Sequence, residues 1–169
     1  MPKFISKFKD KYRERYILEY IEGIVFEHLI TKDRYVFSKS EIYQIVKKLF
    51  DLVEVMHKEN IVHRYVRLPN VIIKDNHELA LIDFGLARYI DNEKYMKQED
   101  YWYIGDFLIH LYYSSYIPSS KEEKPWYEEL DLNKEESIFL KKLMGIEEEY
   151  DNIEQVREQL EILKKTNED

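Results

Sequence analysis

Residues 61–88 restrict the fold of this chain more than any other stretch. They read IVHRYVRLPNVIIKDNHELALIDFGLAR, in which apolar strand-like segments alternate with polar loops. The pattern predicts a hairpin over residues 71–82, with its turn at 75–77. Such a hairpin would bring Asn70 and Asp83 together. An amide oxygen and a carboxylate that converge on one point suit a hard cation such as Mg²⁺, so the sequence predicts a magnesium site here.

The same stretch resembles the catalytic core of the protein kinases, in which H-R-D-L-x-x-x-N is followed by D-F-G. Here the first motif stands as HRYVRLPN at residues 63–70 and the second as DFGLAR at residues 83–88. Order, register and strand–loop–strand context all agree with the family. One position departs from it, because Tyr65 stands where the family has its catalytic aspartate. A phenol is protonated at neutral pH and is a poor proton acceptor.

The resemblance implies a role for each matching residue of the motif. Asn70 and Asp83 occupy the positions that hold Mg²⁺, which bridges the phosphates of ATP. Arg67 stands where the family carries a basic residue that faces the transferred phosphate. His63 and Arg64 resemble the pair of residues that supports the loop.

Two flanking segments extend the resemblance. The segment DYWYIG at residues 100–105 is similar to the start of a central helix whose aspartate binds the backbone of the loop, a role that falls to Asp100. Asp100 can equally be a carboxylate favoured by a helix N-terminus. The segment LEYIEG at residues 18–23 resembles the hinge, where backbone groups of Glu19 and Ile21 would hydrogen-bond adenine. An ordinary edge strand is the alternative.

Several parts of a protein kinase are missing. The four glycines, at positions 23, 85, 105 and 145, form no glycine-rich phosphate loop. No V-A-I-K segment supplies the strand lysine, and the polar residues 89–99 contain no A-P-E. The resemblance therefore implies one truncated kinase-like domain with an α+β fold. Residues 1–22 would be small-lobe strands and hinge, and residues 23–169 a mainly helical large lobe.

Local signals predict the remaining elements. We expect two strands within residues 2–22, a short helix over 23–30 and a long helix over 40–58 that begins with a Ser38–Glu41 capping box. Further helices are expected from Asn133 to Gly145 and from Asp151 onwards, after a linker at residues 118–125.

Composition excludes several classes of protein. The net charge of −8 argues against a nucleic-acid partner. No apolar window is long enough to cross a membrane and no secretory leader is recognisable. With no cysteine the chain has no disulfides, which is compatible with the cytoplasm, where we expect it. Basic residues gather in residues 1–15 and acidic ones in 147–169, as solvated surfaces or as interaction tails.

These observations favour a pseudokinase-like binding or regulatory module that retains Mg-ATP without efficient phosphoryl transfer. Two alternatives are a minimal Ser/Thr protein kinase that a partner completes, and a small-molecule phosphotransferase, whose family shares the loop architecture. A large lobe without its small lobe exposes an apolar upper face. A second copy of the chain, another protein, or the folded-back hairpin of residues 1–20 could cover that face.

Overall fold

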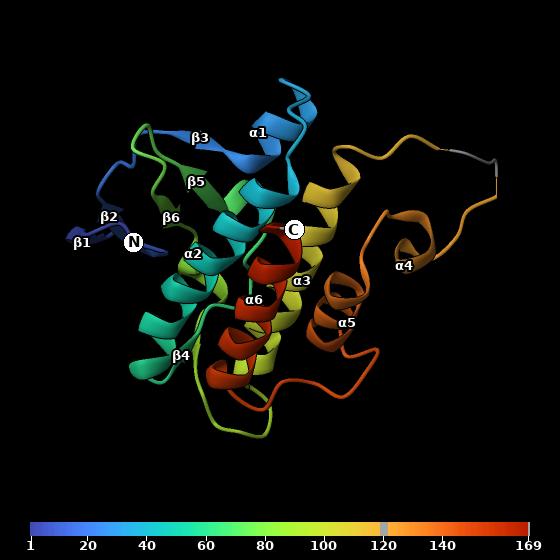
Figure 1. Cartoon of the computed structure of the whole chain (residues 1–169). Coiled ribbons are helices and arrows are strands. Elements are labelled where there is room, and N and C mark those ends of the chain that lie inside the picture. Colours follow the sequence, from blue (N-terminus) through green and yellow to red (C-terminus); the bar gives the residue numbers. More distant parts are fainter. Residues whose placement is uncertain (119–121, 169) are drawn as a thin grey trace.

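A computed structural model of the protein describes residues 1–118 and 122–168. Within these ranges small antiparallel sheets lie beside a group of helices, so the fold is α+β (Figure 1). The helices are α1 (Phe26–Thr31), α2 (Lys39–Lys58), α3 (Lys97–Tyr113), α4 (Trp126–Glu129), α5 (Lys134–Leu143) and α6 (Ile153–Glu168). The strands are β1 (Phe4–Lys9), β2 (Glu14–Leu18), β3 (Ile24–Val25), β4 (Ile61–Val62), β5 (Val71–Ile73), β6 (Leu79–Leu81) and β7 (Arg88–Tyr89). No helix in the described ranges combines the length and apolarity that a bilayer crossing requires.

Helix α2 runs through the centre of the core and packs against α3 and α6. Its start is the predicted capping box: the Ser38 hydroxyl accepts from the Glu41 N–H, and the Glu41 carboxylate accepts from the Ser38 N–H. The apolar residues of its inner face are buried at helical spacing: Ile42, Ile45, Val46, Leu49, Val53 and Met56. Burying each such side chain contributes about 2 kcal/mol to folding, so α2 anchors the core.

The predicted hairpin after the first loop is present and supplies two strands of a three-stranded sheet, with β5 in the middle. β5 pairs with β6 on one side and with β3 on the other, all antiparallel. Gly23 has a φ of 146°, and a Cβ there would lie 2.4 Å from the Ile73 carbonyl oxygen. Because this close approach joins β3 to β5, the helix expected from residue 23 begins only at Phe26.

The predicted N-terminal strands also form a hairpin, in which β1 pairs antiparallel with β2. The Asp10 carboxylate accepts from the N–H groups of Tyr12 and Arg13 and closes the turn, and these bonds lower the pKa of Asp10. Nearly every strand residue is exposed, and the two strands pack chiefly against each other. The option that residues 1–20 fold back as a cover is therefore wrong, because the hairpin leaves both of its faces in solvent.

The C-terminal helices follow the predictions with shifted ends. α5 begins after an Asn133–Glu136 capping box, and Gly145 follows it with a φ of 67°. α6 begins at Ile153 rather than at Asp151, because the Asn152 side chain accepts from the Gln155 N–H. The short α4 is not predicted. Residues 119–121 of the expected linker lie outside the described residues.

Candidate functional site

The hairpin of β5 and β6 places Asn70 and Asp83 at the same end of the sheet. Val71 pairs with Leu81, and the Ile82 N–H donates to the Asn70 carbonyl at 2.9 Å. Asp83 therefore follows directly on the residue that is bonded to the Asn70 backbone. Asn70 and Asp83 are thirteen residues apart in the sequence, and the register of the hairpin brings their backbones to the same end of the sheet.

The side chains of this pair leave oxygen atoms available. Asn70 is buried, and its amide nitrogen donates to the Tyr65 carbonyl at 3.0 Å, which leaves the amide oxygen for another contact. Asp83 is exposed and has a left-handed φ of 61°; one carboxylate oxygen accepts from the Gly85 N–H at 3.2 Å. The Asp83 backbone conformation is one that few residues adopt without local bonds of this kind.

The chemistry of these donors fits Mg²⁺ as one part of a larger coordination shell. Magnesium takes about six oxygen ligands in octahedral geometry and usually keeps waters and phosphates among them. Within residues 1–118 and 122–168, no group of three or more His, Cys, Asp or Glu side chains could hold a metal ion. Asn70 and Asp83 would therefore supply two ligands, and a nucleotide's phosphates would supply others.

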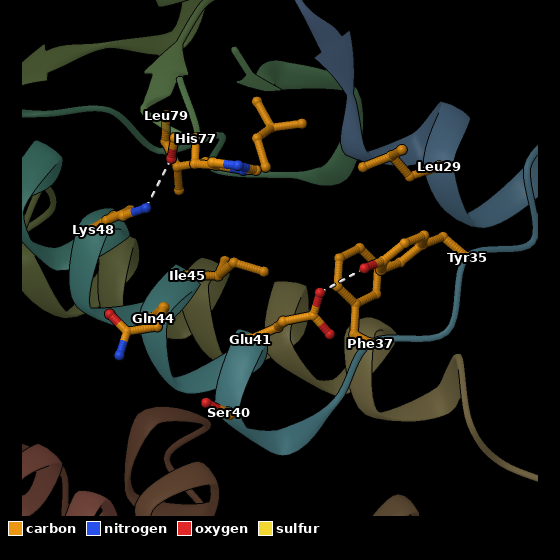
Figure 2. Close-up of a pocket in the computed structure, with 11 residues that line it drawn as sticks. Leu29, Tyr35, Phe37, Ser40, Glu41, Gln44, Ile45, Lys48, His77 and Leu79 are labelled. Carbon is orange, nitrogen blue, oxygen red and sulfur yellow. Dashed lines mark hydrogen bonds between the residues drawn. The ribbon is translucent and has the colours of Figure 1, made fainter. Parts of the chain in front are cut away.

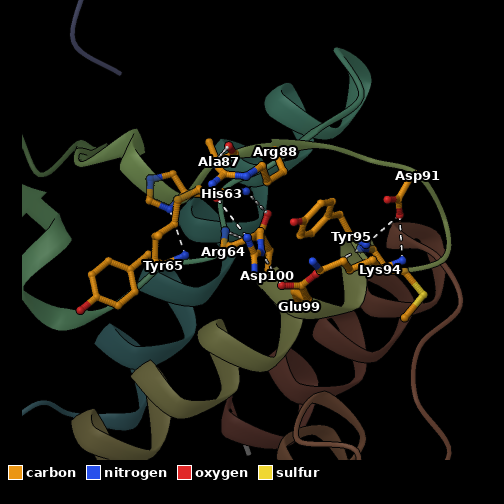
Figure 3. Close-up of polar contacts among 12 residues, drawn as sticks. His63, Arg64, Tyr65, Ala87, Arg88, Asp91, Lys94, Tyr95, Glu99 and Asp100 are labelled. Carbon is orange, nitrogen blue, oxygen red and sulfur yellow. Dashed lines mark hydrogen bonds and ion pairs between the residues drawn. The ribbon is translucent and has the colours of Figure 1, made fainter. Parts of the chain in front are cut away.

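Asp100 fixes the backbone of the loop at residues 63–65 (Figure 3). Its side chain is fully buried in the first turn of α3 and accepts from the N–H groups of His63, at 2.9 Å, and Arg64, at 2.7 Å. The ring Nε2 of His57 lies 2.8 Å from the same carboxylate. α3 begins at Lys97, three residues earlier than expected, but Asp100 still lies in the first turn, where a negative charge is favoured.

His63 is buried beneath this loop. Its Nδ1 accepts from the Tyr65 N–H at 3.2 Å, and its ring meets the ring of Phe84 edge-on at 4.9 Å. Burial lowers the pKa of His63, and the nearby Asp100 carboxylate offsets only part of that effect. The imidazole is therefore a neutral packing group that connects the loop to the D-F-G segment.

Arg64 has two side-chain partners that the sequence motifs do not reveal. Its Nε donates to the Glu99 carboxylate at 2.7 Å, and its guanidinium lies 4.5 Å from the centre of the Tyr95 ring (Figure 3). Lys94, Arg88 and Arg64 together lower the pKa of Tyr95. These contacts tie the segment between β7 and α3 to the loop, and neither Glu99 nor Tyr95 carries a recognisable motif.

The Tyr65 ring has aromatic and cationic neighbours in place of a proton-transfer partner. It meets the Tyr103 ring edge-on at 6.2 Å, and the Arg67 guanidinium lies 5.6 Å from its centre. Arg67 is exposed on the same loop. Tyr65 thus keeps its backbone carbonyl in the Asn70 interaction while its side chain packs against α3.

The two residues expected to contact adenine lie after β2. The Glu19 N–H donates to the Lys3 carbonyl at 2.8 Å, so this donor is already used within the hairpin. The Glu19 carbonyl takes no part in that bond, and adenine contacts by the backbone of Glu19 and Ile21 stay a prediction. Ile21 lies half-buried between the hairpin and Gly23.

A pocket of about 460 Å³ lies between α1, α2 and the β5–β6 hairpin (Figure 2). Apolar side chains including Leu29, Phe37 and Ile45 line it, and Lys48 donates to the His77 carbonyl at 2.8 Å across one side. None of the candidate site residues predicted from the sequence lines this pocket. It is therefore separate from the Asn70–Asp83 pair.

The chain was compared with known proteins, and residues 3–120 match the protein kinase domain. The probable serine/threonine-protein kinase YbdM of Bacillus subtilis (strain 168) is 38% identical over 165 residues, which are 95% of this chain and 64% of that protein. The dual specificity protein kinase zakA of Dictyostelium discoideum is 31% identical over 99 residues, 58% of this chain and 12% of that protein. Calcium-dependent protein kinase 4 of Plasmodium falciparum (isolate 3D7) is 29% identical over 97 residues, 54% of this chain and 18% of that protein.

The chain spans less than two thirds of the length of each of these relatives. The match nevertheless covers most of the chain and includes both motif segments. The Asp100 bonds and the hairpin register give those segments a common geometry. This protein belongs to the protein kinase family.

Proposed function

We propose that this chain is a pseudokinase-like binding or regulatory module, which binds Mg-nucleotide without efficient phosphoryl transfer. The observation that carries the proposal is the combination of Tyr65 with the Asn70–Asp83 pair. The two oxygen donors remain at one end of the hairpin, while a phenol packed against Tyr103 and Arg67 takes the place of the catalytic carboxylate. Metal binding is thereby kept and proton transfer is lost.

We assign residues 23–169 to the large lobe of a kinase and residues 1–22 to small-lobe strands and hinge. The support for this assignment is the order of the parts: a strand hairpin, the LEYIEG segment, a long helix and then both motifs. The sequence contains no glycine-rich loop and no V-A-I-K segment, whose lysine normally binds the phosphates. Nucleotide affinity would then depend on Asn70 and Asp83.

The expected loss of rate is large. When bound, Mg-ATP supplies the phosphoryl group, and the protein's part is to position it and to neutralise charge. General base catalysis typically contributes about 10²–10⁴ in rate, or roughly 3–5 kcal/mol of barrier. The absent lysine and glycine loop remove further phosphate contacts. These losses affect the same step, which favours binding over catalysis.

A second candidate is an ATP-dependent Ser/Thr protein kinase that becomes active when a partner completes it. Retention of both Asn70 and Asp83 favours this candidate, as does the kinase name of the Bacillus subtilis relative. A small-molecule phosphotransferase is the more distant alternative, since DFGLAR and the helix start at 100–105 resemble the protein kinases. A nucleotide is the expected ligand of all three.

Thermal unfolding with Mg-ATP tests the proposed function. We expect a saturating Mg-ATP concentration to raise the melting temperature by about 5 °C, and neither Mg²⁺ alone nor ATP with a chelator to do so. Asp83→Ala should remove the shift. The matched control is Asp75→Ala, which alters an exposed carboxylate in the turn at the opposite end of the same hairpin. An unchanged shift in Asp83→Ala would refute the site, and no shift in the unmodified protein would refute nucleotide binding.

A further inference from the structure

The β1–β2 hairpin exposes an unusual amount of apolar surface. The six large apolar side chains of its strands are 43–61% exposed: Phe4, Ile5, Phe8, Tyr16, Ile17 and Leu18. An isolated two-stranded hairpin is only marginally stable in water, and a third strand or a packed face normally stabilises it. A hairpin of this kind therefore presents a surface that a partner can cover.

The strand register places apolar groups on both faces. Phe4 pairs with Leu18 and meets the Tyr16 ring at 6.4 Å, so these three side chains share one face. Phe8 and Ile17 lie on the other face, because their pairings alternate with those of the first set. Within the described residues each strand has one pairing neighbour, so each leaves an outer edge open. Open edges accept an added strand through main-chain hydrogen bonds.

The charge of the hairpin narrows the choice of partner. Residues 1–15 contain six lysines and arginines but only Asp10 and Glu14 as acids. Asp10 is already bonded to the turn and to Arg15. Lys7 and Lys9 of β1 lie on the Tyr16 face, and no ion pair is described for either of them in the described ranges. A strand added at the β1 edge would place its side chains beside these two lysines.

Two nearby sources of such a strand do not fit. A second copy that pairs β1 with β1 would bring two basic edges together, and like charges on adjacent strands are destabilising. In the acidic stretch at residues 147–169, α6 buries Val156, Leu160 and Leu163 against the core, and the connection before α6 buries Tyr150. It could become an extended strand only by giving up that packing.

We propose that the β1 edge binds an extended segment of another protein in which acidic side chains alternate with apolar ones. Alternation follows from the two-residue period of a strand. One side of the added strand would place carboxylates beside Lys7 and Lys9, and the other side would place apolar groups beside Phe8. This surface lies in the hairpin, and its binding does not depend on the nucleotide proposed above.

Fluorescence anisotropy with the full chain and three labelled ten-residue peptides tests the proposal. One peptide alternates valine and glutamate, the second alternates valine and lysine, and the third is the valine–glutamate peptide with central prolines that block strand pairing. We expect the valine–glutamate peptide to bind about tenfold more tightly than the valine–lysine peptide at low salt, with the difference shrinking as salt rises. The proline peptide should not bind.

A variant with reversed charges in the hairpin gives a more specific test of the same proposal. The double variant Lys7→Glu with Lys9→Glu should prefer the valine–lysine peptide. The new carboxylate at position 9 would face Glu14 across the hairpin, but the hairpin packs chiefly against itself, so the melting temperature of the core should change little. The control Lys124→Glu with Lys134→Glu makes the same charge change at exposed sites elsewhere and should keep the original order. Asp83→Ala should also keep it, which separates this surface from the nucleotide site.

Several results would overturn the proposal. Equal binding of both alternating peptides, binding of the proline peptide, or no binding at all would each exclude a charge-selected strand site. Light scattering that shows a dimer, which the Lys7→Glu with Lys9→Glu variant dissociates, would make a second copy the occupant instead.

Discussion

Asp100 illustrates how one side chain can fix a loop. Its two oxygens accept from the backbone of His63 and Arg64 and lie beside the His57 ring, all away from solvent. Asp100→Asn replaces one of the two acceptor oxygens with an amide NH₂ group. That group would face a backbone N–H donor and could not accept from it. We expect it to lower the free energy of unfolding by about 3 kcal/mol in urea denaturation, because buried donors lose their partner.

The matched control lies on the same helix. Asp106→Asn alters a partly exposed carboxylate, one oxygen of which lies 3.9 Å from the Nδ1 atom of His110. Its cost should stay below about 1 kcal/mol, as is usual for surface pairs. Equal costs for the two variants would mean that the Asp100 bonds contribute little to stability.

Tyr65 is the residue on which the proposed loss of catalysis depends. We expect Tyr65→Asp to transfer little or no radiolabelled phosphate from Mg-ATP to a general protein substrate, since the strand lysine and the glycine loop are still missing. Unmodified protein and Tyr65→Asp with Asp83→Ala serve as controls. Turnover by Tyr65→Asp at about 1 s⁻¹ or more, within the range of ordinary kinases, would instead favour the enzyme reading.

At the level of single elements, sequence predicts best where the signal is local. The α2 helix and the β5–β6 hairpin could be predicted because a capping box, an apolar period and a turn all lie within the segment itself. The start of α1 could not, since Gly23 is held beside Ile73, fifty residues further on. The start of α6 lies two residues later than predicted, because the side chain of Asn152 accepts from the Gln155 N–H.

In the candidate site, too, the residues that could be predicted are those whose signal is local in the sequence. Motif spacing was sufficient to place Asn70 and Asp83 at the same end of the hairpin, because a short hairpin leaves the chain few other arrangements. Glu99 and Tyr95 were missed, because their contact with Arg64 depends on how the polar segment after β7 returns to α3. Polar residues in a loop give no periodic signal from which such a contact could be inferred.

Across the whole molecule, buried and hydrogen-bonded ionisable groups link stability to pH. Burial lowers the pKa of His63, so the unfolded chain binds a proton at a higher pH than the folded protein does. Stability should therefore fall as pH drops below the unfolded value of 6.5. Hydrogen bonds lower the pKa of Glu41 and Glu54, and their contributions are lost only at lower pH, below the unfolded value of 4.5. The pH range in which His63 affects stability therefore lies above the range in which Glu41 and Glu54 do.

Urea denaturation from pH 7.5 to 5 should isolate the His63 contribution. We expect the free energy of unfolding to fall with a slope of at most about 1.4 kcal/mol per pH unit below pH 6.5, the limit for one proton. His63→Asn retains an acceptor for the Tyr65 N–H but does not titrate, so it should be less stable at pH 7.5 and lack this slope. His77→Asn alters an exposed histidine and should leave the slope unchanged. If His63→Asn keeps the full slope, another group takes up the proton, and the neutral buried imidazole is not what makes the loop sensitive to acid.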